Sequence, residues 1–303
     1  MSDYTVLYDA PGPRARRRSV IGGSLATLLI IAGLAVVAKR LNDQGQFSSK
    51  LWAPIFDPGN EFFSDVWRLI GEGLTATMKA AALAIVFSLI LGAVVGVGRM
   101  MLGRWSRMPL AVVMELLRGL PVVISIYFAS RVLPELGADL SFLPGGSGLW
   151  YLVIGLTAYN MVIIAEILRA GVLSLPSGQR EAALAIGLTP IATMRIILLP
   201  QAVRTMLPAL ISQIVVILKD TSLAAVLGLY EEFLRRANLL SQYFDNPIQM
   251  LSLVAAVFIL LNYLLSRLAR WLERRLSRSH RTATRPDDVV DTSVARGLTN
   301  TGV

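Results

Sequence analysis

The chain has 303 residues, of which 54% are hydrophobic and only 16% carry a charge. This composition is too apolar for a soluble domain and is typical of a protein with several membrane-spanning helices. Disulfides and thiolate metal sites are excluded because there is no cysteine, and the single histidine, His280, lies in a basic tail. The formal net charge of +9 does not indicate a nucleic-acid partner, because the arginines cluster at the ends of apolar segments. We expect no metal and no cofactor.

The amino-terminal quarter of the sequence predicts a tail, a membrane helix and an outer segment. Residues 1–19 are polar and basic, and we expect a mobile cytoplasmic tail. The apolar run 20–38 is just long enough to cross a bilayer, which needs about 20 apolar residues. A signal peptide is the alternative, but the run is longer than a signal core and no clear small-residue cleavage site follows it. Residues 39–73 carry prolines, acids and aromatics and are expected to form an extracytoplasmic segment.

Five further apolar segments predict the core of an all-α polytopic membrane protein. On the first of them, Gly92 and Gly96 form a face of small residues suited to close helix packing. The five segments have the approximate bounds 74–97, 111–133, 149–168, 207–229 and 247–268.

The distribution of arginine predicts the orientation of these segments. Residues 99–107 and 269–303 are basic, whereas the loops 134–148 and 230–246 are not similarly basic. Because basic ends of membrane helices stay in the cytoplasm, both termini, the 99–107 loop and residues 169–206 are expected there. The tail from residue 269 is expected to be disordered.

Residues 178–208 interrupt the apolar background with a compact and moderately polar module. Residues 179–186 are rich in strong helix formers, and Gly187 stands where a helix commonly ends in the left-handed conformation. Thr189 and Pro190 have the residue types of an N-cap and a first helical position. A second short helix is therefore expected, closed by the proline at position 200.

One face of the first short helix is small and apolar, because Ala182, Ala185 and Ile186 lie at positions i, i+3 and i+4. A docking surface for another protein and an internal helix–helix contact both fit such a face, and the cytoplasmic placement favours docking. The chain has no G-x-x-x-x-G-K-[ST] phosphate loop, so it cannot hydrolyse ATP in the P-loop manner. Energy must therefore come from a partner or an ion gradient.

Charges within the fourth core segment are the sharpest candidates for function. Lys219 and Asp220 are neighbours on a helix and point in different directions, so they do not neutralise each other. Three explanations stay open: each has a partner on another helix, the helix is broken with Asp220 or Thr221 capping a new half-helix, or both charges reach the outer interface. Ionisable groups at membrane depth are functional candidates, so we include Lys219, Asp220, Thr221 and Ser222 in a substrate pathway.

Two further charge pairs lie near cytoplasmic helix ends. Glu115 with Arg118, and Glu166 with Arg169, are spaced i and i+3, so each pair can form an ion pair within one helix. We interpret both chiefly as structural anchors. Glu115, Arg118 and Glu166 also remain candidates for the pathway or its gating.

These segments resemble the permease subunits of ABC importers for polar amino acids, the group that includes histidine, glutamine and glutamate uptake systems. Glu181, Ala182, Ala183 and Gly187 match the family's Glu-Ala-Ala loop, and the likeness continues in MELLRGLPVV, ILLPQAVRTMLPAL and LKDTSLAAVLGL. It covers about residues 74–268. The additional amino-terminal span is similar to the longer glutamate-type permeases of actinobacteria.

The resemblance implies a type I ABC importer transmembrane fold with five core spans plus one, and a permease that moves glutamate or glutamine by alternating access. It implies no catalysis by this chain, because a dimer of separate ATPase subunits hydrolyses ATP and couples through residues 178–200. It also implies a second permease subunit, either another copy or a similar chain, and an extracytoplasmic amino-acid-binding protein. The coupling residues that it implies are Gln179, Glu181, Ala182, Ala183, Ala185 and Gly187.

The residues leave two other functions open. A secondary transporter would bind protons or ions through Lys219, Asp220, Glu166 or Glu115, although six spans without an evident repeat argue against this for a monomer. A membrane anchor or scaffold would contain no pathway at all.

Overall fold

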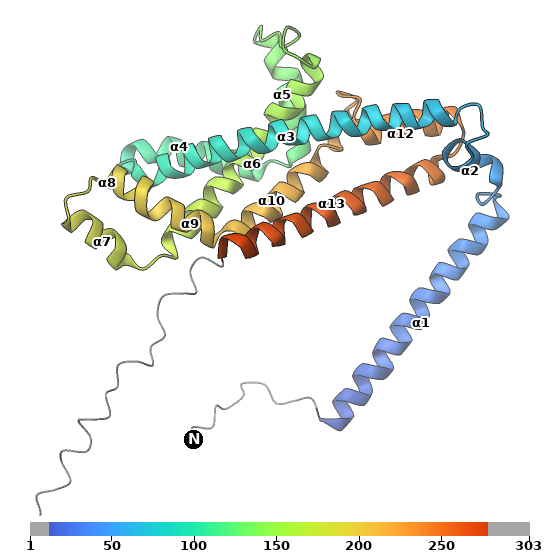
Figure 1. Cartoon of the computed structure of the whole chain (residues 1–303), viewed down its shortest axis with the longest axis horizontal. Helices are drawn as coiled ribbons and strands as arrows, with labels where there is room; N and C mark the ends of the chain where they lie inside the picture. The colour runs from blue at the N-terminus through green and yellow to red at the C-terminus, as the bar shows by residue number, and fades with distance from the viewer. Residues whose placement is uncertain (1–11, 278–303) are drawn as a thin grey trace, which may run out of the picture. The chain divides into compact units, whose positions relative to one another are not determined.

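The computed structural model describes residues 12–277, which are mostly helical and contain no strand (Figure 1). Within them, five helices are long and apolar enough to cross a bilayer, or six stretches when one bent pair is counted as a span. The predicted all-α architecture is confirmed. In chain order the helices are α1 (Pro13–Asp43), α2 (Ser49–Phe56), α3 (Phe63–Met101), α4 (Arg104–Gly119), α5 (Val122–Glu135), α6 (Gly146–Leu173), α7 (Ser177–Ala185), α8 (Pro190–Ala192), the π-helix η1 (Thr193–Leu198), α9 (Leu199–Thr205), α10 (Leu207–Asp220), α11 (Leu223–Leu227), α12 (Phe233–Tyr243) and α13 (Pro247–Ser277).

Contacts divide the described residues into two units, 12–68 with 238–252, and 69–237 with 253–277. In the first unit, α1 includes the predicted span 20–38 and has no buried residue. The helix begins at Pro13, earlier than the expected end of the tail at residue 19, because proline suits the first helical position and the arginines after it favour helix. Residues 1–11 of that predicted tail lie outside the described chain.

The segment predicted to lie outside the membrane is ordered within this unit. Its short helix α2 is fixed by polar contacts to its own backbone carbonyls: the indole N–H of Trp67 donates to Ile55 at 3.0 Å, and the amide of Asn246 donates to Leu51 at 3.0 Å. Aromatic and amide donors thus satisfy backbone groups that an irregular segment leaves open.

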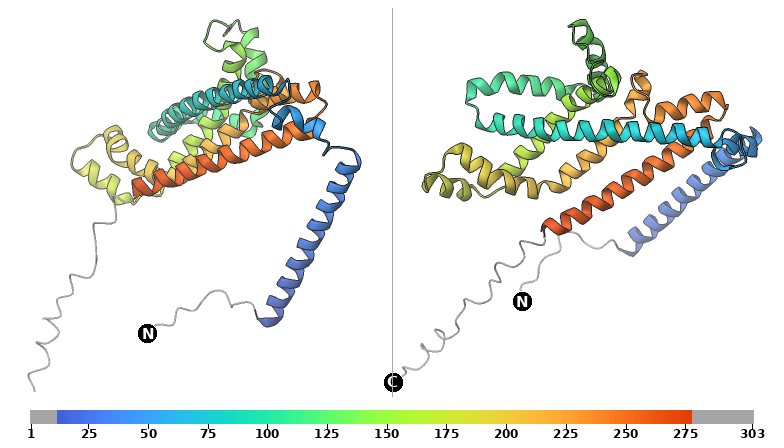
Figure 2. Two further views of the ribbon diagram at one scale, coloured as in Figure 1. Left: turned by 45° about the vertical axis from the view of Figure 1, so that its right-hand side comes forward. Right: turned by 45° about the horizontal axis from the view of Figure 1, so that its top comes forward.

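The core of the second unit is built around α6, which contacts α4, α5, α9 and α10. Buried residues occur all along α6, as expected for a helix that is apolar on every side. Leu152, Leu156 and Ile164 are almost fully buried there, and Ile126 of α5 and Ile217 of α10 pack in the same cluster. Figure 2 shows α3 and α4 running back along each other as an antiparallel hairpin above α6.

The span predicted at about 111–133 is not a single straight helix. The structure divides it into α4 and α5, which meet at an angle of 108°. Leu120 has an extended backbone because it precedes Pro121, and the residue before a proline is disfavoured in the helical conformation. The motif GLP in MELLRGLPVV therefore marks a sharp corner.

Two predicted helix ends also differ from the structure. The second helix of the 178–208 module does not stop at Pro200 but continues through α9 to Thr205, and a π-helical turn directly precedes the proline, which has no N–H for the preceding turn. The final helix, α13, extends to Ser277 through residues that were assigned to a disordered tail from 269. The rest of that tail, 278–303, lies outside the described residues.

The small face of α3 packs closely against α6, as predicted. A Cβ atom added at Gly92 would lie 2.7 Å from the Cγ2 of Ile164, and one added at Gly96 would lie 3.1 Å from the Cα of Ala165. A Cβ at Gly98, on the same helix, meets nothing within 4 Å.

We therefore predict that Gly92→Ala destabilises the protein and that Gly98→Ala does not. Overpacking at Gly92 should cost about 1–3 kcal/mol, whereas alanine at Gly98 should be neutral or slightly stabilising because it favours helix. Thermal unfolding of both variants in the same detergent measures the difference. Equal midpoints for the two variants would contradict the close α3–α6 contact.

Candidate functional site

The turn after α7 has the geometry that its sequence predicts. Gly187 adopts a left-handed φ of +87°, and the amides of Gly187 and Leu188 donate to the carbonyls of Leu184 at 3.0 Å and Ala183 at 3.1 Å. These bonds satisfy carbonyls at the helix end. The hydroxyl of Thr189 then accepts from the amide of Ala192 at 3.2 Å, which caps the next helix as predicted.

The two faces of α7 have different environments. Ala183 is buried, and α7 packs against η1. Ala182, Ala185 and Ile186 are exposed, with Ile186 78% exposed. The small face is therefore not an internal contact of the described chain, and it lies open beside the exposed carboxylate of Glu181.

The Lys219–Ser222 segment is a break between two helices. α10 ends at Asp220 and α11 begins at Leu223, so the broken-helix alternative is the correct one. Thr221 is fully buried, and its hydroxyl donates to the backbone carbonyl of Leu218 at 2.7 Å. The hydroxyl of Ser222 donates to the backbone carbonyl of Lys219 at 2.8 Å. These hydroxyls satisfy the carbonyl end of α10, so they do not cap a new half-helix as anticipated.

Neither charge of this segment forms an ion pair with a side chain that the structure describes. Lys219 is exposed and Asp220 is partly exposed, both at the end of α10. An unpaired charge in an apolar segment requires water, a polar ligand or a second subunit beside it. The sequence-based interpretation of Lys219 and Asp220 as functional candidates is consistent with this placement.

Glu166 is the centre of an ion-pair cluster. Its carboxylate accepts from Arg169 on the same helix at 2.7 Å and pairs with Arg99 at the end of α3. The cluster ties α3 to α6, so Glu166 has the structural role considered for it. Glu115 and Arg118 are both exposed, and no such pair joins them in the described chain.

A buried amide pair connects α6 and α10 between the apolar side chains. The side-chain amide of Gln213 donates to the oxygen of Asn160 at 2.6 Å, and Asn160 donates to the carbonyl of Leu156 at 2.7 Å. The nearby hydroxyl of Thr157 is buried without a partner. Amides within an apolar helix commonly bind across to a neighbouring helix, but the sequence does not say which residue on that neighbour they meet.

Glu232 was also missed from the sequence. It precedes α12, outside the spanning segments, and its buried carboxylate accepts from the amides of Leu234 at 2.9 Å and Arg235 at 2.7 Å. Burial raises the pKa of Glu232 to about 7, opposed by these two amides and by the hydroxyl of Thr77. The acid thus caps a helix where Ser, Thr, Asp or Asn is more usual, which is why the sequence carried little signal.

The fold and these sites can be compared with known proteins. The model of the family described as binding-protein-dependent transport system inner membrane component matches residues 67–278, well over half of the sequence. The chain belongs to this family. It is therefore a multi-pass membrane component of a transport system, and the relatives that it matches are named as permease proteins.

Individual relatives agree with this assignment. The permease is 39% identical over 238 residues to the glutamate transport system permease protein GluD of Corynebacterium glutamicum, covering 78% of this chain and 83% of that one. It is 34% identical over 218 residues to the glutamine transport system permease protein GlnP of Escherichia coli strain K12, covering 71% and 97%.

The solved structures confirm the type I ABC importer fold. A crystal structure of an amino acid ABC transporter with histidines matches with a TM-score of 0.62 and 26% identity, over 71% of this permease and 99% of that chain. An inward-facing MetNI methionine ABC transporter matches with a TM-score of 0.59 and 18% identity, which supports the fold alone.

The raised pKa of Glu232 makes the stability of the permease depend on pH. The folded carboxyl holds its proton up to about pH 7, whereas the unfolded one loses it near its ordinary value, so stability should fall as pH rises between these values. The full change is about 3 kcal/mol for this shift.

Thermal unfolding of wild type and Glu232→Gln from pH 4.5 to 8.5 measures this effect. The glutamine variant should lose much of the decrease in midpoint between pH 5 and 7, because its side chain does not titrate. A decrease of the same size in both proteins would assign the pH dependence to other groups.

Proposed function

We propose that the chain is the permease subunit of an ATP-driven importer for glutamate or glutamine. The observation that carries the proposal is the exposed small face of α7, which follows Glu181 and ends at the left-handed Gly187. The names of two of the most similar relatives, a glutamate and a glutamine permease, support the substrate class. The chain lacks a phosphate loop, so hydrolysis belongs to a partner.

In this proposal a dimer of ATPase subunits docks on α7. Gln179, Ala182 and Ala185 lie on or beside the docking face, and Ala183 holds the helix to the permease from the other side. A small face lets a partner's backbone approach closely. The proposed orientation of the permease in the membrane follows from the clustering of arginine at one end of the helices. Both termini, the α3–α4 turn and residues 169–206 lie in the cytoplasm.

The pathway is proposed to run beside the broken helices α4–α5 and α10–α11. Lys219 and Asp220 are unpaired within the described chain, and together they offer a cation and an anion to a zwitterionic substrate. Thr221 and Ser222 complete the helix break, and the exposed Glu115 and Arg118 are candidates for gating. The other half of the pathway comes from a second permease subunit, either a second copy or a similar chain.

An extracytoplasmic binding protein delivers the amino acid and selects it. Binding energy of the ATPase in its nucleotide-bound state shifts the permease between two conformations that open to opposite sides. The permease contributes the two conformations and no covalent chemistry.

The substrate and the energy source are tested by purifying the complex from its native membrane and reconstituting it in liposomes. We expect glutamate or glutamine, presented on the binding protein, to stimulate ATP hydrolysis and to be taken up only when ATP is supplied. Uptake driven by an ion gradient in liposomes that contain this chain alone would instead establish a secondary transporter.

A second experiment tests the coupling role of α7. Gly187→Leu places a branched side chain in a left-handed conformation at a cost of about 1–2 kcal/mol. The fraction of molecules in which α7 ends correctly, and with it the rate of uptake, should fall by about tenfold. Gly187→Asn is the matched control, because asparagine tolerates this conformation and a Cβ at this position meets nothing within 4 Å.

Glu181→Lys is the companion variant, since its exposed side chain can be replaced without disturbing the fold. It should leave the permease inserted while weakening its binding to the ATPase.

Full uptake by Gly187→Leu at normal expression would remove α7 from the coupling mechanism.

A further inference from the structure

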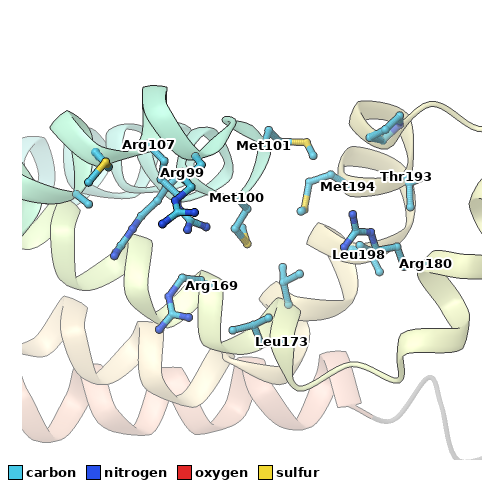
Figure 3. A pocket seen from close by; sticks show the side chains of 15 residues that line it. Arg99, Met100, Met101, Arg107, Arg169, Leu173, Arg180, Thr193, Met194 and Leu198 are labelled. Atoms are coloured by element: carbon cyan, nitrogen blue, oxygen red, sulfur yellow. The ribbon is translucent and has the colours of Figure 1, made fainter.

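A second site lies at the arginine-rich end of the helices. A cavity of about 660 Å³ opens between the α3–α4 turn, the end of α6, and the module of α7, α8 and η1 (Figure 3). Five of its lining residues are arginines and none is acidic: Arg99, Arg104, Arg107, Arg169 and Arg180.

The charges of this cavity are not balanced within the described chain. Arg99 and Arg169 share the single carboxylate of Glu166. Arg104, Arg107 and Arg180 are exposed and form no ion pair among the side chains that the structure describes. Five guanidinium groups around one space repel one another, so the arrangement is stabilised when an anion enters. Guanidinium groups bind phosphate well, because their N–H groups match its oxygens in pairs.

A buried hydroxyl in the wall of the cavity is a second, independent indication of a ligand. Thr193 is only 1% exposed, lines the cavity, and its Oγ1 has no hydrogen-bond partner. It begins the π-helical turn η1, and such turns are frequent at functional sites. An unsatisfied buried hydroxyl costs free energy that a bound acceptor removes.

The rest of the lining is apolar, which favours an amphiphilic ligand over a soluble anion. Met100 and Met101 of α3 and Met194 of η1 lie around the same space as the arginines (Figure 3). Both α3 and α6 end here after long apolar segments, so the cavity lies where a bilayer surface meets the protein. Trp105, 83% exposed beside Arg104, has the residue type that prefers this depth.

We propose that this cavity binds the phosphate headgroup of an anionic phospholipid, with its acyl chains along the apolar lining. The headgroup phosphate accepts from Arg104, Arg107 and Arg180 and from the hydroxyl of Thr193. Because α7 carries Arg180, a bound lipid holds α7 to the α3–α4 turn. The site uses the membrane location of the chain and does not depend on the transported substrate.

The test uses the full-length chain, alone and in its ATPase complex, in lipid nanodiscs and by native mass spectrometry with phosphatidylglycerol and phosphatidylcholine as probes. Wild type should retain phosphatidylglycerol in preference to phosphatidylcholine. The double variant Arg104→Gln/Arg107→Gln should bind it about 30-fold more weakly, the effect of removing two basic residues near a membrane surface. Thr193→Val should also bind it more weakly, since it removes the hydroxyl and keeps the shape.

The controls separate a site from general positive charge. Arg195→Gln/Arg204→Gln removes the same two positive charges at exposed positions of η1 and α9 outside the cavity, and should bind as wild type does. Arg104 and Arg107 are not part of the ion pairs of Glu166, so their replacement does not disturb that cluster.

Four results would overturn the proposal. Equal retention of both lipids would show no preference for an anionic headgroup. Equal weakening by Arg195→Gln/Arg204→Gln would indicate general positive charge without a site. Displacement of the lipid by millimolar inorganic phosphate would indicate a soluble anion. Loss of the lipid whenever the ATPase binds would assign the arginines to acidic groups of that partner.

Discussion

The bilayer core offers no water to a backbone N–H or C=O, so the chain itself must satisfy these groups wherever an apolar helix is interrupted. The permease has such interruptions at Leu120 and at Thr221, and both are built from residues that solve the problem locally. Pro121 has no N–H to satisfy, and the hydroxyls of Thr221 and Ser222 satisfy carbonyls at the end of α10. The broken helices are thus permitted by their own sequences.

Unlike the interrupted helices, α3, α6 and the first part of α10 are held together by close packing and polar bonds. The second unit therefore has parts of different stiffness. Glycine at position 92 brings α3 onto α6, and Arg99 ties the end of α3 to Glu166 of α6. The amide pair of Asn160 and Gln213 fixes α10 to α6 before the break is reached. The fixed portion is therefore α3, α6 and the first part of α10, whereas the corner after residue 119 and the interruption after residue 220 are the places where backbone angles can change.

Features that depend on local chemistry could be predicted from the sequence, and those that depend on partners distant in the chain could not. The left-handed Gly187, the cap at Thr189 and the small face at Gly92 each follow from the residue's own properties. The Asn160–Gln213 pair and the bridge from Arg99 to Glu166 join residues that only the fold brings together. The ion pair that the spacing of Glu115 and Arg118 allowed is absent from the described chain, and nothing in the structure explains this. The corner at Pro121 was missed because overall hydropathy dominated a local backbone signal.

The connection from α7 to the broken helix α10–α11 explains how a docking event at one end could reach a pathway within the membrane. α7 packs on η1, which continues directly into α9, and α9 packs against both α6 and α10. In the proposed mechanism, a force applied to α7 acts on α10 through this short run of helix, with α6 as the surface against which the run packs. The π-helical turn is the soft element of this run, because its widened hydrogen-bond pattern is less stable than an α-helix. Thr193 is the first residue of that turn and lines the arginine cavity, so an anion bound there would stiffen the element that is proposed to connect α7 with α10.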